Sequence, residues 1–317
     1  MKSDLALALF GAILIAAPAL AQAKKAEDPN IWLENVTGNK SLAWVAKQNK
    51  QSVGELTSSP GFKALNERFL GILNSTARIP YVSKIGGYYY NLWRDTQHER
   101  GLWRRTTLEE YRKAEPKWET VLDVDALGKE EKVSWVWEGA QTLPPDYERC
   151  LISLSRGGAD ARVIREFDLK KKEFISDGFK LPESKSNASW INKDLLYLAP
   201  AFDSTTMTTS GYSRVAKEWK RGTPYSSATT VYEGQPADVY AGASHDFTPG
   251  FERDFVSRGI TFYSNETFLR QDGKLVKIDK PDDAEVGTFH EWLLVQLRTD
   301  WTVGGKTWPP ARCSPRI

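Results

Sequence analysis

From Ile79 onward the chain is a succession of short segments rich in β-branched and aromatic residues, separated by Gly, Asp, Asn and Pro. Examples are GGYYYNLWRD, VSWVWEGA and RCLISLSRGG. This spacing is typical of antiparallel strands joined by tight turns. Because no helical periodicity separates the segments, we expect an all-β region of about 230 residues with no helix between its strands.

A longer repeat underlies these strands. Apolar residues that follow a polar hairpin recur at roughly 50 residues, the period expected of four-stranded propeller blades; they are Val121, Phe174, Val231 and Val276. The repeat is degenerate, and a large pair of β-sandwiches fits the strand pattern equally well. The blades expected from the repeat are 79–125, 133–179, 188–234 and 238–280, with a fifth that begins at Ala284.

The β pattern stops after Trp308, where the sequence continues as PPARCSPRI. A propeller closes on itself, because an open one leaves strand edges and a blade face exposed. Residues 79–308 therefore predict an incomplete propeller of about four and a half blades. We expect 309–317 to be an aberrant tail produced by a shift of reading frame, which the genomic sequence beyond the last codons would test.

Residues 24–78 precede the strands, and from residue 28 they have a helical pattern. Apolar residues recur at helical spacing from Ser41 to Leu56, with one break at Asn49, and again from Phe62 to Ile72. Pro60 and Gly61 separate the two runs. The pattern predicts two amphipathic helices.

The first 23 residues resemble an export signal. Lys2 precedes an apolar run from Leu5 to Leu20, and Ala21-Gln22-Ala23 forms a small-x-small cleavage site. We expect cleavage after Ala23 and a periplasmic or secreted product. The run is short of the roughly 20 residues needed to span a bilayer, so we expect no stable membrane anchor. A retained anchor is the alternative.

The composition argues against several classes of partner and cofactor. With 43 basic and 41 acidic residues the net charge is +2, so we expect no nucleic-acid partner. Three His and two Cys, widely scattered, do not predict a zinc site. We expect no disulfide between Cys150 and Cys313. Phosphate-binding glycine motifs do not occur, and no cofactor is expected.

The sequence contains no Gly-x-Ser-x-Gly motif, which in α/β-hydrolases exposes the nucleophile. Ser155 lies at a strand end before a Gly-Gly turn, where a structural role is expected. Ser244, His245 and Asp246 are adjacent, but neighbours in a strand point to opposite faces and do not form a catalytic triad. We therefore assign no catalytic, cofactor-binding or metal-binding residue.

Other polar and aromatic residues have simple structural interpretations. We expect His98 and His290 to be solvated or satisfied by local hydrogen bonds. Alternate tryptophans such as Trp135 and Trp137 favour sheet packing over a sugar-binding surface. Arg104 and Arg105 are expected to be solvated, the alternative being a bidentate grip on a carboxylate.

Two stretches resemble a known family. DPNIWLENVTGNKSLAWVAKQN (28–49) is similar to the opening signature of the prolyl oligopeptidase family of serine peptidases; the matching residues are Asp28, Pro29, Trp32, Leu33, Glu34, Trp44, Val45, Gln48 and Asn49. GGYYYNLWRDTQHERGLWRRTTLEEY (86–111) resembles the first propeller blade of bacterial members. The resemblance continues to Trp308, and it favours the propeller over the sandwich pair.

The resemblance implies a helical N-terminal segment, a seven-bladed propeller and an α/β-hydrolase domain that carries Ser, Asp and His and packs against the helical segment. In this family the propeller admits short peptides, and cleavage typically follows proline. No position here matches the nucleophile, Asp or His segments, so no catalytic residue is carried over. We expect the N-terminal portion of an exported peptidase, inactive alone, with the missing hydrolase domain as its packing partner.

Two other functions remain open. One is a non-catalytic propeller that binds peptides or proteins as a scaffold. The other is carbohydrate binding through exposed tryptophans, which needs an aromatic row on one face.

Overall fold

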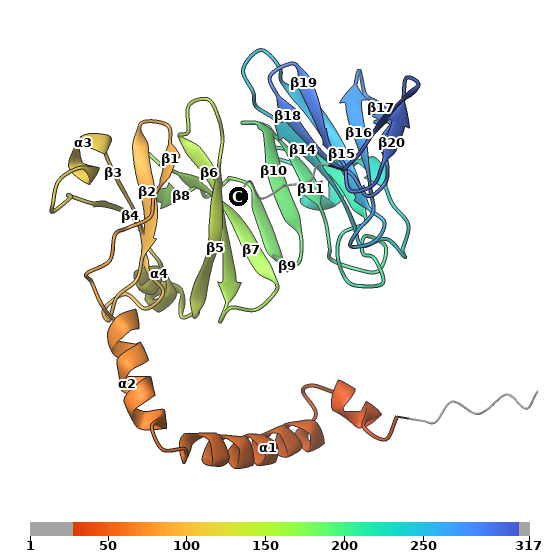
Figure 1. Ribbon diagram of the computed structural model, residues 1–317. Coiled ribbons are helices and arrows are strands. Elements are labelled where there is room, and N and C mark those ends of the chain that lie inside the picture. Colours follow the sequence, from red (N-terminus) through yellow and green to blue (C-terminus); the bar gives the residue numbers. More distant parts are fainter. Residues whose placement is uncertain (1–27, 311–317) are drawn as a thin grey trace, which may run out of the picture. The chain divides into compact units, whose positions relative to one another are not determined.

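A computed structural model describes residues 28–310 (Figure 1). The chain divides into two compact units between Ile72 and Leu73, and each unit is considered by itself. The expected signal peptide with its cleavage after Ala23, and residues 311–317 of the tail, lie outside the described residues. No helix among the described residues has the length and apolar character required to cross a membrane.

The first unit is helical, as predicted. It contains the 3-10 turn η1 (Ile31–Glu34) and the helices α1 (Asn39–Thr57) and α2 (Phe62–Leu73). Gly61, at the predicted break, has a φ of +94°, which glycine adopts at little cost. The Trp32 ring packs edge-on against Trp44, with 6.2 Å between centroids, and Ser41 Oγ donates to the Trp32 carbonyl at 3.0 Å.

The apolar side chains of α1 and α2 recur at the predicted positions but are exposed. Within η1, α1 and α2 the one buried residue is Ser41. The exposed apolar residues of the two helices are Leu42, Trp44, Val45, Val53, Leu56, Phe62, Leu65, Phe69, Leu70, Ile72 and Leu73. Each helix thus presents an apolar face that nothing in its own unit covers.

The second unit is built from antiparallel sheets of consecutive strands. The first sheet comprises β1 (Ser83–Ile85), β2 (Tyr88–Trp93), β3 (Leu102–Thr106) and β4 (Glu119–Asp123). The second comprises β5 (Trp135–Thr142), β6 (Arg149–Arg156), β7 (Arg162–Asp168) and β8 (Glu173–Phe174), and β9 (Lys180–Ser184) also pairs with β7.

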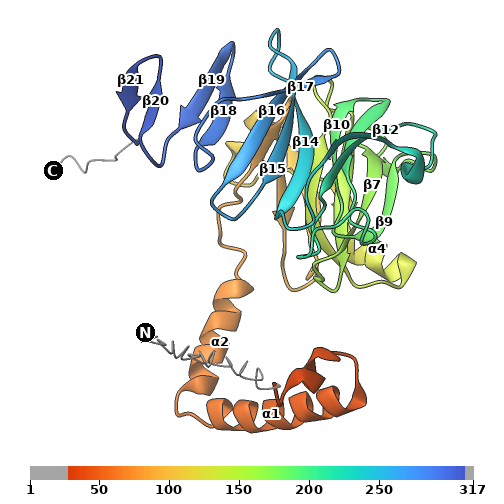
Figure 2. The same cartoon turned by 90° about the vertical axis from the view of Figure 1, so that its right-hand side faces the viewer.

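Two further four-stranded sheets and two hairpins follow (Figure 2). The third sheet comprises β10 (Asn187–Asn192), β11 (Leu195–Ala199), β12 (Val215–Lys220) and β13 (Thr229–Glu233). The fourth comprises β14 (Tyr240–Asp246), β15 (Arg253–Gly259), β16 (Asn265–Gln271) and β17 (Lys274–Lys277). The hairpins are β18 (Glu285–Phe289) with β19 (Trp292–Gln296), and β20 (Trp301–Val303) with β21 (Lys306–Trp308).

The 50-residue repeat marks one structural position. The four apolar residues that define it lie in the fourth strand, counted along the chain, of each of the four successive sheets: Val121 in β4, Phe174 in β8, Val231 in β13 and Val276 in β17. The first and fourth sheets fall within the ranges read from the repeat, and the third begins one residue before its range, at Asn187. The second range is wrong at its end, because β9 (Lys180–Ser184) lies beyond residue 179 and adds a fifth strand to that sheet. The period in the sequence is therefore the period of the sheets.

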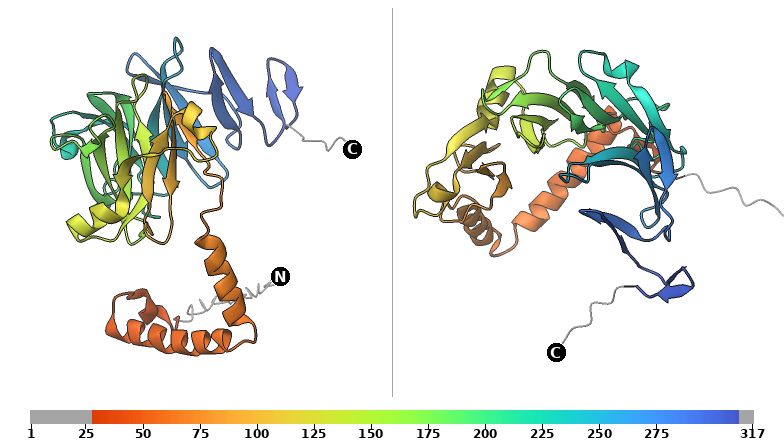
Figure 3. Two further views of the ribbon diagram at one scale, coloured as in Figure 1. Left: turned by 90° about the vertical axis from the view of Figure 1, so that its left-hand side faces the viewer. Right: turned by 90° about the horizontal axis from the view of Figure 1, so that it is seen from above.

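The four sheets follow one another side by side in chain order (Figure 3). One cluster joins the first and second sheets, where the rings of Trp103 and Trp137 lie 4.9 Å apart between centroids. A second cluster joins the second and third sheets around the fully buried Trp190. The third and fourth sheets meet where Arg270 Nη1 donates to Tyr197 Oη at 2.9 Å. Packing of each sheet on the next is that of a propeller.

The expectation that no helix lies between the strands is wrong. α3 (Leu108–Tyr111), α4 (Val124–Glu131) and the 3-10 turn η2 (Tyr225–Ser227) interrupt them. α4 is specified by its ends: the Asp123 carboxylate accepts from the Ala126 amide at 2.9 Å, and Lys132 ends the helix in the left-handed conformation, with a φ of 56°. Buried Val124 and Leu127 fix the helix to the first cluster.

Asp123→Ala is expected to lower the free energy of unfolding by about 1 kcal/mol, because it removes the side-chain acceptor of the α4 N-terminus. Thermal or urea unfolding monitored by circular dichroism measures the change. Glu130→Ala, at an exposed position of the same helix, is the matched control and should change stability by much less. Equal effects of the two variants would show that the cap contributes nothing specific.

Candidate functional site

Ser155 has a structural role, as expected. It lies on β6 with no exposed surface, and its Oγ donates to Glu138 Oε1 on the adjacent strand β5 at 2.6 Å. The hydroxyl is therefore committed to a cross-strand hydrogen bond. No histidine takes part in this contact.

The adjacent residues Ser244, His245 and Asp246 lie on β14, and their side chains have separate surroundings. His245 Nδ1 lies 2.9 Å from Asp254 Oδ1 on β15. Asp246 accepts from Thr248 Oγ1 at 2.6 Å, and although burial opposes ionisation, this and its other hydrogen bonds lower the pKa of Asp246 to about 2. The three side chains do not form a proton relay, as strand geometry predicts.

The remaining histidines and the described cysteine are also accounted for locally. His98 Nδ1 lies 2.9 Å from Asp95 Oδ1, a local hydrogen bond of the expected kind. His290 has a φ of +49° in the β18–β19 turn. Cys150 is free and buried, and burial raises the pKa of its thiol, so it is unsuited to act as a nucleophile. Among residues 28–310 no group of three or more His, Cys, Asp and Glu is arranged to hold a metal ion.

Trp135 and Trp137 pack in the sheets, as predicted: Trp135 is 3% exposed and Trp137 packs against the first apolar cluster. The expectation that Arg104 and Arg105 are solvated is wrong. Arg105 Nε pairs with Glu119 Oε2 at 2.6 Å. The Arg104 guanidinium lies 4.3 Å and 4.2 Å from the ring centroids of Trp93 and Trp118.

Both arginines find partners because side chains alternate along β3. Neighbouring residues of a strand point to opposite faces, and each face offers a partner. One face supplies the Glu119 carboxylate and the other supplies two indole rings, which attract the guanidinium. Both arginines therefore stabilise the first sheet from within.

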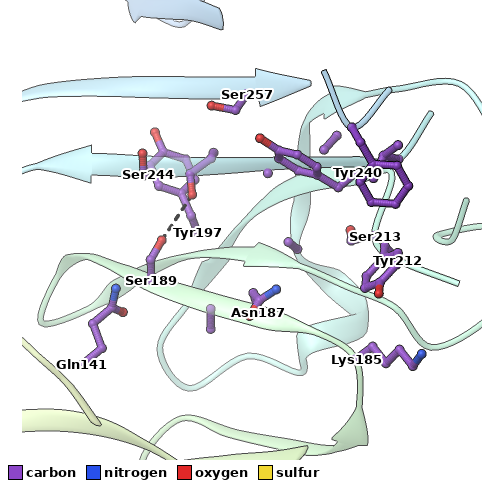
Figure 4. A pocket seen from close by; sticks show the side chains of 17 residues that line it. Gln141, Lys185, Asn187, Ser189, Tyr197, Tyr212, Ser213, Tyr240, Ser244 and Ser257 are labelled. Atoms are coloured by element: carbon purple, nitrogen blue, oxygen red, sulfur yellow. Dashed lines mark hydrogen bonds between the residues drawn. The ribbon is translucent and has the colours of Figure 1, made fainter. Parts of the chain in front are cut away.

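The strongest candidate for a binding site is a pocket of about 550 Å³ formed mainly by β10, β11 and β14 (Figure 4). A pocket of this size, with aromatic rings and a few polar groups, is suited to a small ligand or a short stretch of polymer. Figure 4 shows Tyr212 and Tyr240 on one side of the pocket and Ser189, Ser244 and Tyr197 on the other. None of these residues was recognised as a pocket residue from the sequence.

Tyr240 is placed at the pocket by the register of β14 and β15. Tyr240 lies opposite Gly259. A Cβ atom at Gly259 would lie 2.4 Å from Tyr240 Cε1, so the ring lies across the backbone where a side chain would otherwise stand. Glycine within a strand commonly marks such a close approach. This pair holds Tyr240 half exposed at the pocket margin.

Tyr212 is held by a tight turn between β11 and β12. The Thr208 amide donates to the Tyr212 carbonyl at 2.8 Å, and Gly211 has a φ of +85°, which favours glycine. Lys185 lies against the Tyr212 ring, with Nζ 5.4 Å from the centroid.

Phe262 projects from a closed loop between β15 and β16. The Ile260 amide donates to the Ser264 carbonyl at 2.9 Å, and the hydroxyls of Thr261 and Ser264 are 2.7 Å apart. The closed loop leaves Phe262 86% exposed and the neighbouring Tyr263 77% exposed. Of these two rings, Phe262 lines the pocket.

The electrostatic character of the pocket comes from one cation. Of the residues that line it, Lys185 alone carries a charge. Asp160 Oδ2 lies 2.7 Å from Lys185 Nζ, and this hydrogen bond raises the pKa of the lysine. The remaining polar lining consists of hydroxyl and amide groups. Such a pocket suits a ligand with oxygen acceptors.

Comparison with known proteins identifies the fold and the family. The profile of the family described as prolyl oligopeptidase, N-terminal β-propeller domain, matches residues 18–248. The chain belongs to the prolyl oligopeptidase family. The resemblance read from residues 28–49 and 86–111 is thereby confirmed.

Relatives in the prolyl oligopeptidase family are considerably longer than this chain. An uncharacterized peptidase of Sinorhizobium fredii is 38% identical over 287 residues, which are 88% of this chain and 40% of the relative. An uncharacterized peptidase of Rickettsia prowazekii is 30% identical over 285 residues, which are 85% of this chain and 40% of the relative. The chain therefore spans about 40% of the length of these curated relatives.

Solved structures agree with this assignment. A post-proline cleaving enzyme from Rickettsia typhi superposes with a TM-score of 0.79 at 30% identity, over 85% of this chain and 41% of that enzyme. Prolyl oligopeptidase B from Galerina marginata, bound to a 35mer substrate, superposes with a TM-score of 0.64 at 16% identity. The second likeness concerns the fold alone.

Proposed function

We propose that this chain is the substrate-gating propeller portion of a prolyl-oligopeptidase-type serine peptidase and that it does not hydrolyse peptides by itself. The observation that carries the proposal is the match of residues 18–248 to the N-terminal propeller domain of the family, in a chain that spans about 40% of the relatives' length. Ser155 Oγ donates to Glu138 and His245 Nδ1 lies beside Asp254, so these two candidates do not form a serine–histidine pair. A nucleophile and an oxyanion hole supply most of the rate enhancement in acyl transfer.

The proposed packing partner is a hydrolase domain of the kind expected in the family. The apolar faces of α1 and α2 support this, since they are exposed in the first unit. Exposed apolar surfaces of this extent on soluble proteins commonly mark interaction sites. The proposed substrates are short peptides cleaved after proline.

The test is an activity assay with complementation. The purified chain alone should not hydrolyse a chromogenic Xaa-Pro peptide. Production together with the remaining C-terminal portion of the Sinorhizobium fredii relative should give hydrolysis that a serine-reactive phosphonate abolishes. Phosphonate-sensitive hydrolysis by the chain alone, or none from the combination when both parts are soluble, would refute the proposal.

We also propose export, with cleavage after Ala23. Lys2, the apolar run and the small-x-small site support it. Mass spectrometry of the product from a bacterial periplasmic extract should give a mature N-terminus at Lys24. An intact Met1 in the membrane fraction would instead favour a retained anchor.

The second candidate function is a scaffold that binds peptides without a hydrolase, and the pocket at β14 favours it. A scaffold should be a stable monomer, or an oligomer that closes the ring. An incomplete propeller should associate through exposed strand edges. Size-exclusion chromatography and thermal melting of the purified chain distinguish these two behaviours.

A further inference from the structure

The pocket is bounded by an unpaired edge of β14. β14 pairs with β15 along one edge, and within residues 28–310 no strand pairs with the other. Two hydrogen bonds identify the peptide groups on the second edge. The Ala241 amide donates to the Ser213 carbonyl at 2.7 Å, and the Ala243 carbonyl accepts from Ser189 Oγ at 3.2 Å.

The Ala243 amide belongs to this same edge. In an antiparallel strand the amide and carbonyl of one residue point to the same side, and the side alternates from one residue to the next. The Ala243 N–H therefore points away from β15, as its carbonyl does, and Ala243 lines the pocket. In the described part of the chain no acceptor outside the sheet pairs with this N–H. A backbone donor of this kind requires water or a ligand.

Three exposed aromatic rings line the same pocket, in addition to the buried Tyr197. Tyr212 is 44% exposed, Tyr240 is 43% exposed and Phe262 is 86% exposed. They come from three separate segments, and each is held by its own local structure: a turn, the contact with Gly259 and a closed loop. Rings that converge in this way provide a large apolar contact area for a ligand side chain.

The combination of features indicates the chemistry of the ligand. A free main-chain donor on a strand edge beside an apolar side-chain pocket is how proteins bind extended peptides. A sugar presents many hydroxyl donors, for which carboxylates are the strongest acceptors. Neither Asp nor Glu is among the residues that line the pocket. The one charged lining residue, Lys185, is paired with Asp160, and its ammonium group has further N–H donors for a peptide carbonyl.

We infer that the pocket binds an extended peptide: a main-chain carbonyl of the peptide accepts from the Ala243 amide, and a ring side chain of the peptide lies among Tyr212, Tyr240 and Phe262. The inference rests on the proposed function, because it assigns a place on the propeller to the peptides that the peptidase would act on. It locates a binding contact that needs no hydrolase domain.

Fluorescence anisotropy of the full chain with an N-terminally fluorescein-labelled Gly-Phe-Gly-Phe-Gly-Gly peptide tests this. When this peptide is extended, its two phenylalanine rings lie on the same face, because alternate residues of an extended chain point to the same side. Phe262→Ala should weaken binding about tenfold, the cost expected for truncating an aromatic anchor. Tyr263→Ala is the matched control, since Tyr263 is exposed in the same loop without lining the pocket, and it should leave the affinity unchanged.

Gly242→Leu provides a second, independent variant. A Cβ at Gly242 would lie 4.0 Å from Ala199 Cβ, an ordinary contact, so the backbone accepts a side chain that occupies the pocket. This variant should abolish binding without lowering the melting temperature. Binding that persists in Gly242→Leu, or equal losses in Phe262→Ala and Tyr263→Ala, would overturn the inference.

Two probes examine the chemistry. Phenylalanine amide carries the ring without an extended main chain and should compete at least tenfold less well than the unlabelled hexapeptide; equal competition would overturn main-chain pairing. Maltohexaose should not displace the labelled peptide, and displacement would make the pocket a carbohydrate site.

The complementation assay separates this inference from the proposed function. If hydrolysis is restored but the chain does not bind the peptide, this inference alone is overturned. If the chain binds the peptide but hydrolysis is not restored, only the proposed function is overturned.

Discussion

Trp190→Ala is expected to lower the free energy of unfolding of the sheet unit by about 3–5 kcal/mol, the cost of removing a large aromatic side chain from a close-packed core. Trp190 is 1% exposed at the centre of the cluster that joins the second and third sheets. Its Nε1 also donates to the Gln141 carbonyl on β5 at 2.9 Å, so the substitution leaves that acceptor without its partner. Domains are commonly stable by only 5–15 kcal/mol.

Urea unfolding followed by intrinsic fluorescence and circular dichroism measures the effect. Trp292→Ala is the control, because Trp292 is 61% exposed on β19 and should change stability little. If the Trp190 and Trp292 variants unfold at the same urea concentration, the second cluster does not hold the sheets together.

Glu166→Gln should destabilise the same interface by about 3 kcal/mol, the lower end of the range for breaking a buried ion pair. The Glu166 side chain has no exposed surface. Arg221 donates to both of its carboxylate oxygens at 2.9 Å, Arg149 Nη1 donates at 2.7 Å, and the Phe179 amide donates at 2.9 Å. Arg221 follows β12 of the third sheet, so the carboxylate ties that sheet to the second.

The effect should depend on pH. Burial alone would raise the pKa of Glu166, but the hydrogen bonds from Arg221, the Phe179 amide and Arg149 outweigh it and lower the pKa. Since the folded-state pKa lies below the unfolded value of about 4.3, the stabilisation is complete above that value. It is lost as the pH falls through the folded-state pKa.

Melting temperatures of the wild type and Glu166→Gln should therefore differ most near pH 7, and the difference should shrink progressively as the pH falls below the unfolded value toward the folded-state pKa. Glu183→Gln removes one partner of the more exposed pair with Arg156, and it should change stability by about 0–1 kcal/mol. If the difference in melting temperature between the wild type and Glu166→Gln stayed constant down to pH 3, the proposed role of the Glu166 charge would be excluded.

The sheets were predictable because their cause is local. Strand and turn residues follow one another at short range, and the apolar residues from Val121 to Val276 repeat at the spacing of the sheets. The helix α4 was missed although its signals are local too. Its eight residues are too few for a helical period to emerge, and Asp123 at its start is equally compatible with a turn.

The pocket could not be predicted because its parts meet only through tertiary structure. Tyr240 lies at the margin of the pocket because the pairing of β14 with β15 places Gly259 opposite it. Tyr212 and Phe262 lie on two separate loops that contribute to the same pocket. Glycines within a β region, such as Gly242 and Gly259, were the available sign of a close approach. Likewise, the partners of Arg104 and Arg105 depend on which strand lies beside β3.

The strand order within the sheets has a consequence for how the protein is made. In the first, third and fourth sheets every strand pairs with the strand that directly precedes or follows it in the chain. Contacts within a sheet therefore have short sequence separation, which favours rapid formation. During synthesis each sheet can complete its hydrogen bonds before the next one leaves the ribosome. The interfaces around Trp190 and Glu166 then form later, as one finished sheet docks on another.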